Sequence, residues 1–377
     1  MKRVLISGGA GFIGSSLALR LLDSGDKIRI LDNLSPQIHG PDGESSYLFK
    51  RLRGHVEFLK GDVRNREDWE RALDGCDSVV HLAAETGTGQ SMYMVKHYVD
   101  VNIQGTAVLM EVLAQGRFPM ERLVVASSRA VYGEGAYRCL RHGDVYPAGR
   151  DENDLKNGHF EPRCPRCGAF VTMAITPEDA PLSPTSLYGI TKLAQEQMVM
   201  TMGSALGLPC VGLRFQNVYG PGQSLHNPYT GILAIFTNLL RSGKGINIFE
   251  DGRESRDFVF IDDVVHSIVS SLAGGRADGR VLNIGSGVPL TVFDAANYLK
   301  ELLGGRSEIA VSGNFRIGDI RHNVADLRRA EEALDFRPTV DVKDGIKRYV
   351  DWVLTQDAHS TGYEESLNEM RAKGLLK

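Results

Sequence analysis

The sequence predicts an α/β protein built on a doubly wound parallel sheet, with a smaller C-terminal lobe interleaved with it. Short apolar runs, which we expect to be strands, lie at 4–7, 28–31, 56–59, 78–81, 123–126 and 211–215. Amphipathic helical patterns, such as 13–22 and 69–73, lie between them. Apolar strands that alternate with helices are typical of a parallel sheet covered on both faces.

A glycine-rich turn joins the first of these strands to the first helix. The motif consists of Gly8, Gly11, Phe12, Ile13 and Gly14. A helix N-terminus after such a turn can face a pyrophosphate. Asp32 follows about 20 residues later, at the end of the second strand, where a carboxylate can bind ribose hydroxyls and repel a 2′-phosphate. We therefore expect a Rossmann-fold site that prefers NAD to NADP.

The alternation of strands and helices becomes looser beyond about residue 217. We expect 1–216 to form the NAD-binding domain and 217–377 to form mainly a substrate-binding lobe, interleaved with the first. The segment 134–176 fits neither part, because it is polar, rich in Gly, Pro and Arg, and carries three of the five cysteines. A loop of this length inside a compact domain is usually functional, disordered or held by a cross-link.

Three further residues have the pattern of a proton-transfer site. Tyr188 and Lys192 are four positions apart and therefore share one face of a helix. An ammonium group beside a phenol lowers the phenol pKa, so we expect Tyr188 to act as a general base. Ser128 follows the strand 123–126 at the carboxyl edge of the sheet, where its hydroxyl can share the substrate proton, although a simple turn residue is the alternative.

Together these residues resemble the extended short-chain dehydrogenase/reductase family, in its nucleotide-sugar epimerase/dehydratase branch. The motifs that carry the resemblance lie at 8–14, 32–34, 61–62, 81–84, 102–106, 127–133, 188–192, 213–221, 256–263 and 316–319. They extend over nearly the whole chain, in the order that the family has.

The resemblance implies a role for each residue of the site. It implies Ser128, Tyr188 and Lys192 as the catalytic set, with Tyr188 and Lys192 also against the cofactor. The further cofactor-binding residues that it implies are Asn33, Asp62, Val63, Leu82, Ala83, Ala84 and Asn102. The substrate-binding residues that it implies are Ser128, Asn217, Arg256, Arg316 and Asp319. For Asp62, a helix cap is an equally good interpretation, and each arginine taken alone fits a surface ion pair.

The reaction is indicated by two residues that differ from part of the family. The 4,6-dehydratases carry an Asp-Glu pair directly after the catalytic Ser or Thr, whereas this chain has Arg129 and Ala130. The remaining chemistry is 4-epimerisation through transient C4 oxidation and hydride return. A narrower similarity to the dTDP-L-rhamnose 4-epimerases lies in 89–93, 181–186 and the cysteine-bearing segment, and it implies dTDP-6-deoxy-L-talose as the product. The alternatives are a UDP-hexose 4-epimerase, a sugar-nucleotide 4-ketoreductase or dehydrogenase, and a non-catalytic NAD-sensing scaffold.

The segment 134–176 contains two short Cys/His motifs. Cys139 and His142 form the first, and Cys164 and Cys167 form the second. Two such motifs have the spacing of a structural tetrahedral zinc site, and a bound metal would compensate for the small core of a polar loop. We therefore expect zinc on these four residues; the alternative is free thiols in a disordered loop.

Composition sets the class of the protein. The 377 residues carry a net charge of -4, with 42% hydrophobic and 24% charged residues. This balance favours neither nucleic acid nor a membrane as partner. The N-terminus enters a strand directly and no apolar run has the length of a membrane span, so we expect a cytoplasmic enzyme. The family resemblance adds the expectation of a homodimer paired through helices around 93–113 and 186–202.

Overall fold

A seven-stranded parallel sheet forms the centre of the computed structural model, which describes residues 1–225, 227, 229, 231–357 and 362–377. The strand order is β13-β9-β5-β4-β1-β2-β3. The strands are β1 (Arg3–Ser7), β2 (Lys27–Asp32), β3 (Glu57–Lys60), β4 (Ser78–His81), β5 (Arg122–Ser128), β9 (Cys210–Phe215) and β13 (Val281–Ile284). All six strands expected from the sequence are present, within two residues of their expected ends, and the doubly wound α/β fold is confirmed.

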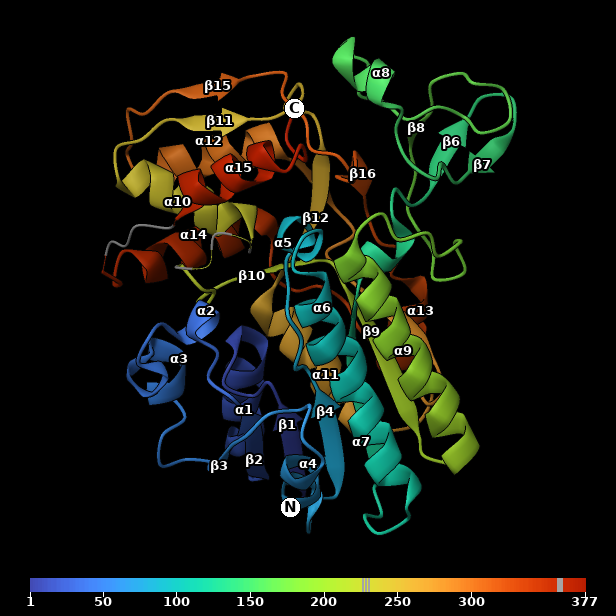
Figure 1. Ribbon diagram of the computed structural model, residues 1–377, viewed down its shortest axis with the longest axis vertical. Coiled ribbons are helices and arrows are strands. Elements are labelled where there is room, and N and C mark those ends of the chain that lie inside the picture. The colour runs from blue at the N-terminus through green and yellow to red at the C-terminus, as the bar shows by residue number, and fades with distance from the viewer. Residues whose placement is uncertain (226, 228, 230, 358–361) are drawn as a thin grey trace.

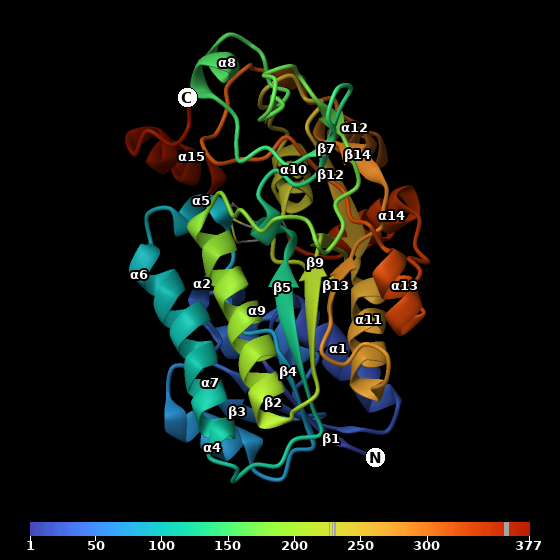
Figure 2. The same ribbon diagram turned by 90° about the vertical axis from the view of Figure 1, so that its right-hand side faces the viewer.

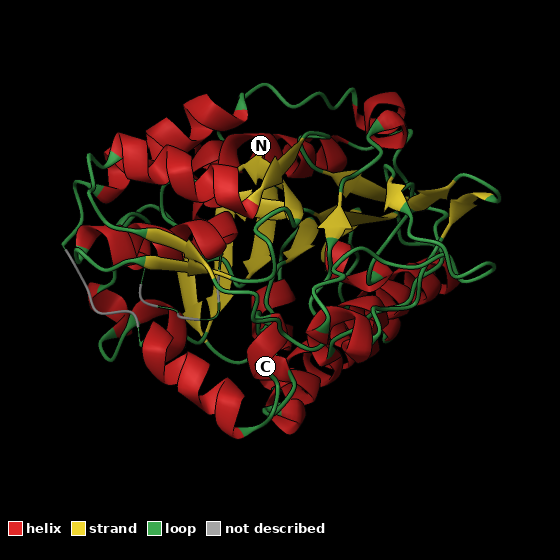
Figure 3. Ribbon diagram, turned by 90° about the horizontal axis from the view of Figure 1, so that it is seen from above, coloured by secondary structure: helices red, strands yellow, loops and turns green. Residues whose placement is uncertain are grey.

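Helices cover both faces of this sheet (Figure 3). On one face lie α1 (Phe12–Asp23) and α11 (Ile261–Ala273), and on the other lie α4 (Arg66–Leu73), α7 (Gly105–Ala114) and α9 (Leu187–Leu206). Successive strand residues point to opposite faces. Val4 and Ile6 therefore pack in the core with α1, whereas Leu5 packs in the core with α4 and α7. Two apolar faces explain why these strands appear as continuous hydrophobic runs.

The second lobe stands beyond the carboxyl ends of the strands (Figure 1). Its strands are β10 (Asn217–Tyr219), β12 (Ser255–Phe260), β14 (Pro289–Thr291) and β16 (His322–Asn323), with a separate pair of β11 (Ile246–Ile248) and β15 (Ile309–Val311). Its helices are α10 (Ile232–Arg241), α12 (Val292–Leu302), α14 (Val342–Val353) and α15 (Tyr363–Ala372), whereas α13 (Arg328–Leu334) packs against β13 of the central sheet and against α11. Because β13 and α11 return to the central sheet, the division at 216/217 stays a prediction about domains.

The segment 134–176 folds as a small projecting unit, which we call the insertion. It contains a three-stranded antiparallel sheet of β6 (Tyr137–Cys139), β7 (Gly143–Val145) and β8 (Thr172–Met173), and the short helix α8 (Glu152–Lys156). In Figure 1 it stands at the upper right, beside β16. Its own core is small and consists of Tyr137, Cys139, Val145, Cys164 and Val171.

Short elements complete the described chain. They are α2 (Pro36–His39), α3 (Tyr47–Lys50), α5 (Thr88–Ser91), α6 (Val95–Tyr98), a π-helical turn (Val99–Gln104) and two 3-10 turns (Gly43–Ser45 and Arg129–Tyr132). Within the described part of the chain, no helix combines the length and the apolar character that crossing a bilayer requires.

Candidate active site

One cavity of about 540 Å³ lies at the carboxyl ends of the central strands, between the sheet and the second lobe. Its walls contain most of the residues expected from the sequence. From the cofactor set these are Gly8, Gly11, Phe12, Ile13, Gly14, Asp32, Asn33, Val63, Leu82, Ala83 and Ala84. From the catalytic and substrate sets these are Ser128, Tyr188, Lys192, Asn217, Arg256, Arg316 and Asp319. Parallel strands explain this convergence, because all their carboxyl ends meet at one edge.

The glycine turn leaves no room for side chains between β1 and α1. A Cβ atom on Gly8 would lie 2.8 Å from the backbone of Ala83, and Gly8 has a φ of 70°. A Cβ atom on Gly14 would lie 2.5 Å from the carbonyl oxygen of Gly8. The backbone therefore borders the cavity directly at the N-terminus of α1, which is a cradle suited to a pyrophosphate group.

Asp32 ends β2 at the edge of the same cavity. Its carboxylate accepts hydrogen bonds from the backbone N–H groups of Ala10 (3.0 Å) and Leu34 (2.8 Å). Burial raises its pKa, although these hydrogen bonds oppose the shift. Both oxygens are thus fixed by the backbone next to the glycine turn, in a position where a ribose hydroxyl can add a further hydrogen bond.

Two residues of the expected cofactor set do not line the cavity. Asp62 is occupied by Arg64, whose Nε and Nη2 atoms lie 2.9 and 2.6 Å from its carboxylate oxygens. Asn102 is fully buried, accepts a hydrogen bond from the Glu85 N–H (2.7 Å) and donates one to the Thr191 hydroxyl (2.9 Å). Asn102 therefore joins the loop after β4 to helix α9, on which Tyr188 and Lys192 lie.

The N-terminus of α9 brings Tyr188 to Ser128. Ser186 caps the helix by accepting a hydrogen bond from the Gly189 N–H (3.2 Å), and Ser91 accepts one from the Tyr188 N–H (3.0 Å). A Cβ atom on Gly189 would lie 2.5 Å from the carbonyl oxygen of Ala130, so only glycine permits this approach. The hydroxyl of Ser128 is thereby near enough to the phenol of Tyr188 to lower its pKa.

The protonation of the pair differs from our expectation. Burial raises the pKa of Tyr188 above its ordinary value, and only the Ser128 hydroxyl and the Arg129 guanidinium oppose the shift. Burial also lowers the pKa of Lys192 to about 7, and its ammonium donates to Gln195 at 2.8 Å. In contrast to the expected depression of the tyrosine pKa, Lys192 does not oppose this shift, because burial favours the neutral form of the lysine.

Two arginines, Arg256 and Arg316, line the part of the cavity that we call the arginine wall. Arg256 forms an ion pair with Asp319 (3.1 Å) and donates to the carbonyl groups of Ile320 (2.9 Å) and Arg321 (3.0 Å). The Arg316 guanidinium lies over the ring of Phe249, 4.6 Å from its centroid. Among the described residues, the Arg316 Nε and Asn217 Oδ1 atoms find no hydrogen-bond partner although they are buried. Buried polar atoms require partners, so this wall fits a polar, anionic ligand.

Several cavity residues were not expected from the sequence. Arg129 lines the cavity near both Tyr188 and Arg256 of the arginine wall, and burial lowers its pKa to about 10. Glu254 lies on the same wall, and burial raises its pKa to about 7. Tyr363 and Met370 of α15 also line the cavity. The signal in the sequence for these two residues is the apolar spacing of Tyr363, Leu367 and Met370, which form one stripe of a helix.

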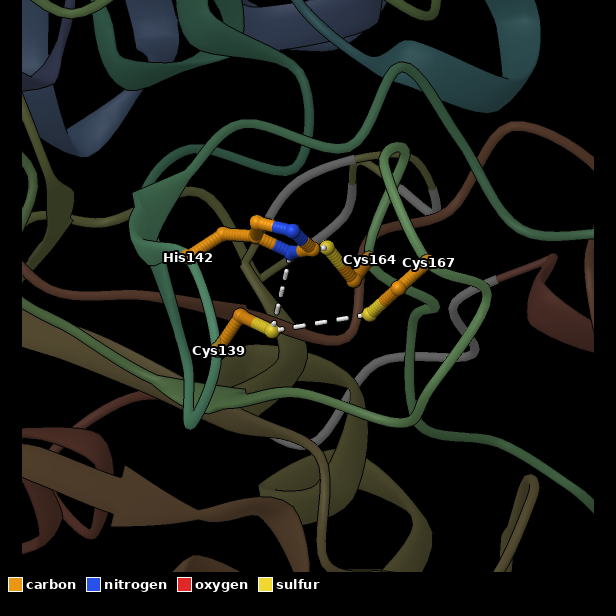
Figure 4. A group of neighbouring side chains, drawn as sticks. All are labelled: Cys139, His142, Cys164 and Cys167. Atoms are coloured by element: carbon orange, nitrogen blue, oxygen red, sulfur yellow. Dashed lines mark hydrogen bonds between the residues drawn. The ribbon is translucent and has the colours of Figure 1, made fainter.

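The four expected metal ligands lie together on the insertion (Figure 4). Their nitrogen and sulfur atoms are all within 4.8 Å of one another. Sγ of Cys139 lies 3.7 Å from Nδ1 of His142 and 3.8 Å from Sγ of Cys167, and Sγ of Cys164 lies 3.5 Å from the same nitrogen. Sulfurs about 2.3 Å from one tetrahedral zinc ion are about 3.8 Å apart. The donor set and its spacing thus fit a closed zinc site.

Comparisons with known proteins agree on one family. The model of the NAD dependent epimerase/dehydratase family matches residues 4–165 and 170–285. The dTDP-L-rhamnose 4-epimerase of Burkholderia thailandensis is 38% identical over 360 residues, which are 94% of this chain and 96% of that protein.

Two solved structures have the same fold over nearly the same length. The UDP-glucose 4-epimerase of Thermotoga maritima, solved with UDP-glucose, gives a TM-score of 0.76 at 28% identity. The UDP-glucuronic acid 4-epimerase of Bacillus cereus, solved with UDP-glucuronic acid and NAD, gives 0.76 at 25% identity. In each case 94% of this chain and 99% of the other are covered. The glycine turn, the Ser128/Tyr188/Lys192 set and the arginine wall surround one cavity. Together with the family match and the 38% identical relative, they show that the chain belongs to the NAD-dependent epimerase/dehydratase family.

Proposed function

We propose that this protein is an NAD-dependent nucleotide-sugar 4-epimerase that converts dTDP-L-rhamnose to dTDP-6-deoxy-L-talose. The observation that carries the proposal is the meeting of Ser128 and Tyr188 with the glycine turn and the arginine wall in a single cavity. The choice of substrate rests on the relative that is 38% identical, which is named for dTDP-L-rhamnose. UDP-hexoses are the second candidate, since other relatives are named for UDP-glucose and UDP-glucuronate.

The cofactor is proposed to be NAD. The glycine turn and the N-terminus of α1 would hold the pyrophosphate, and Asp32 would bind the adenosine ribose. Lys192 is the candidate ligand of the nicotinamide ribose, since it lines the cavity one helical turn beyond Tyr188. NAD, when bound, supplies an acceptor for the C4 hydride and a donor for its return to the opposite face of the sugar.

The chain's own residues provide the proton chemistry. Tyr188 takes the proton of the sugar O4 hydroxyl and returns it after the sugar has turned, while Ser128 hydrogen-bonds the same oxygen. The positive charge of Arg129 favours the phenolate form of Tyr188, which burial disfavours. Arg256 and Arg316 bind the diphosphate, so that the sugar can rotate while the nucleotide stays fixed.

The proposal is tested by incubating the purified protein with dTDP-L-rhamnose, UDP-glucose and UDP-glucuronic acid and following the products by NMR. We expect epimerisation of the dTDP sugar without added NADH. A reaction that instead consumes stoichiometric NADH would identify a ketoreductase. Turnover of a UDP sugar without turnover of dTDP-L-rhamnose would contradict the proposed substrate and support the UDP-hexose alternative.

Replacement of Tyr188 by Phe is the control for this mechanism. The variant retains the ring and its packing but loses the proton acceptor, so kcat should fall by about 10²–10⁴-fold. The amount of NAD that copurifies should equal that of the wild type, because the ring stays in place. Residual activity close to the wild-type rate would require another base.

We also propose one structural zinc ion per chain, bound by Cys139, His142, Cys164 and Cys167. Backbone N–H groups of Arg141 and His142 lower the pKa of Cys139, which favours the thiolate that binds metal. All four ligands come from the protein, so no coordination position remains for a catalytic water. The proposed role is to hold the insertion together, because its five-residue apolar core is small.

Elemental analysis of protein prepared without chelator tests the metal assignment. We expect one zinc per chain in the wild type and loss of metal in Cys164→Ser, with faster proteolysis within 134–176. Cys76→Ser is the matched control. Cys76 is also buried, but it lies in the core beside α4, away from the insertion, so its replacement should not change the zinc content. Wild-type protein without stoichiometric metal would contradict the proposal.

The oligomer is proposed to be a homodimer that pairs through α7 and α9. These helices run side by side on one face of the sheet (Figure 2). Large apolar side chains are exposed next to them, with Val95 48% and Ile190 49% accessible. Apolar residues exposed on adjoining helices are typical of an interface between copies of one chain.

A further inference from the structure

A buried network of charges joins the insertion to the wall of the cavity. The side chains of Glu134, Arg150, Glu250 and Arg321 are each at most 5% exposed. Arg150 forms ion pairs with Glu134 (3.1 Å) and Glu250 (2.8 Å), and Arg321 forms one with Glu250 (3.1 Å). Arg321 also donates to Asp251 (2.7 Å). Charges removed from water in this way are held only while every partner is present.

Arg150 connects this network to the residues that line the cavity. Its Nη2 atom donates to the carbonyl oxygen of Asp319 (2.8 Å), the residue that pairs with Arg256. Glu250, one of the two carboxylates that pair with Arg150, lines the cavity, whereas Arg150 does not. Although burial opposes it, the charges of Arg256, Arg316 and Arg150 hold the pKa of Asp319 below its ordinary value. Arg150 thus fixes the backbone and the charge of the segment that carries Arg316 and Asp319.

The same arginine lies in the loop that the metal ligands close. His142 stands before it and Cys164 after it, and its Nη1 atom donates to the carbonyl of Phe160 (3.3 Å). Glu161, in the next position, accepts from Nε of Arg321 at 2.8 Å. The fold of this loop therefore determines whether both arginines keep their partners.

We propose that Arg150 is a positioning residue through which the insertion sets the affinity of the active site for the nucleotide diphosphate. The inference rests on the proposed function, since it assumes that the Arg256 and Arg316 wall binds that group. It assigns the insertion to substrate affinity and separates it from cofactor binding, because no contact of Arg150 leads to the glycine turn or to Asp32.

The test compares Arg150→Lys with the wild type and with Arg138→Lys. Lysine keeps the buried positive charge that Glu134 and Glu250 need, but it cannot reach them and the Asp319 carbonyl at once. Arg138 is the matched control, because it lies on the same insertion, 61% exposed, in an ion pair with Asp144 (2.8 Å). The measurements are KM and kcat for dTDP-L-rhamnose, the dissociation constant of dTDP by calorimetry, and the NAD content of the purified protein.

For Arg150→Lys we expect KM and the dTDP dissociation constant to rise about tenfold. This change corresponds to the loss of one charged hydrogen bond, here the bond from Arg150 to the Asp319 carbonyl. NAD content and kcat at saturation should stay near wild-type values, and Arg150→Met should show the larger loss of dTDP affinity. Unchanged dTDP affinity in Arg150→Lys overturns the proposal, as does a parallel loss of NAD, which would indicate general destabilisation. The dTDP measurement needs no turnover, so a wild type that binds dTDP without epimerising dTDP-L-rhamnose contradicts the proposed reaction alone. A wild type that does not bind dTDP contradicts both.

Discussion

Lys192 occupies an interior that disfavours its own charge. The side chain is 3% exposed, and burial lowers its pKa from 10.5 to about 7. A lysine in this position lowers the stability of the fold. Such a cost is common at positions where a residue serves catalysis or binding. The residue therefore fits its proposed place beside the nicotinamide ribose, whose hydroxyl groups can accept hydrogen bonds from its Nζ atom.

Replacement of Lys192 by Met should stabilise the cofactor-free protein in a pH-dependent way. Between about pH 7 and 10.5 the unfolded lysine keeps a proton that the folded one has lost, so the wild type gains stability from this group as pH rises. The unfolding free energy of the methionine variant should therefore be larger than that of the wild type at pH 7, and the difference should become smaller towards pH 10. Urea denaturation at several pH values measures both free energies; a difference that does not change with pH would contradict the pKa assignment.

The residue identities of the site were predictable, but their protonation states were not. Tyr188, Lys192 and Ser128 follow from motifs, because spacing fixes which face of a helix or which end of a strand they occupy. A pKa depends on what surrounds the group in three dimensions. The burial that raises the pKa of Tyr188 and the charge of Arg129 that opposes it are set by packing between distant segments, which no spacing reveals.

Helix α9 begins at a close backbone contact with the turn that follows β5. Its second and third residues, Tyr188 and Gly189, lie against the 3-10 turn after β5, where a Cβ atom on Gly189 would meet the carbonyl oxygen of Ala130. Backbone atoms on both sides cannot rotate away, so the contact fixes the distance between the two catalytic hydroxyl groups.

Replacement of Gly189 by Ala should separate these groups. The new Cβ would lie 2.5 Å from the Ala130 oxygen and would displace the start of α9 from Ser128. We expect kcat to fall at least about tenfold and the unfolding free energy to fall by about 1–3 kcal/mol, the usual cost of overpacking. Gly149→Ala is the control, because nothing lies within 4 Å of its Cβ position. Wild-type kcat in Gly189→Ala would show that α9 tolerates the shift.

Elements with a strong periodic pattern were predicted best. β1, β4 and β9 are apolar on both faces, so their sequences alone indicate buried strands. The role of α15 was missed because its apolar stripe is short and lies among charges. The charge network of the insertion was missed for another reason: Glu134 and Arg321 are 187 positions apart, and pairs of that separation leave no local pattern.

The proposed dimer would pair through α7 and α9. Val95 in α6 and Ile190 in α9 are 48% and 49% exposed. These two helices lie on the opposite side of the molecule from α12 and α14 of the second lobe (Figure 2). A double change of Val95 and Ile190 to Glu should place charges in the interface and produce monomers of 41.3 kDa, where the wild type should have twice that mass. Val311→Glu is the control, since Val311 is 46% exposed on β15. Light scattering after size exclusion measures the mass; a monomeric wild type would contradict the dimer.

The insertion leaves and rejoins the protein through one narrow neck. The N–H of Ala136 donates to the Thr176 hydroxyl (3.0 Å), and the N–H of Ala174 donates to the Ala136 carbonyl (3.1 Å). Because its two ends touch, the insertion spans no distance between β5 and α9, which lie on either side of it in the chain. The same neck makes the insertion exchangeable in the laboratory. A short hairpin that joins 136 to 174 should leave the backbone of β5 and α9 in place, but it would remove Arg150 and Glu161 and so leave Glu250 and Arg321 without these partners.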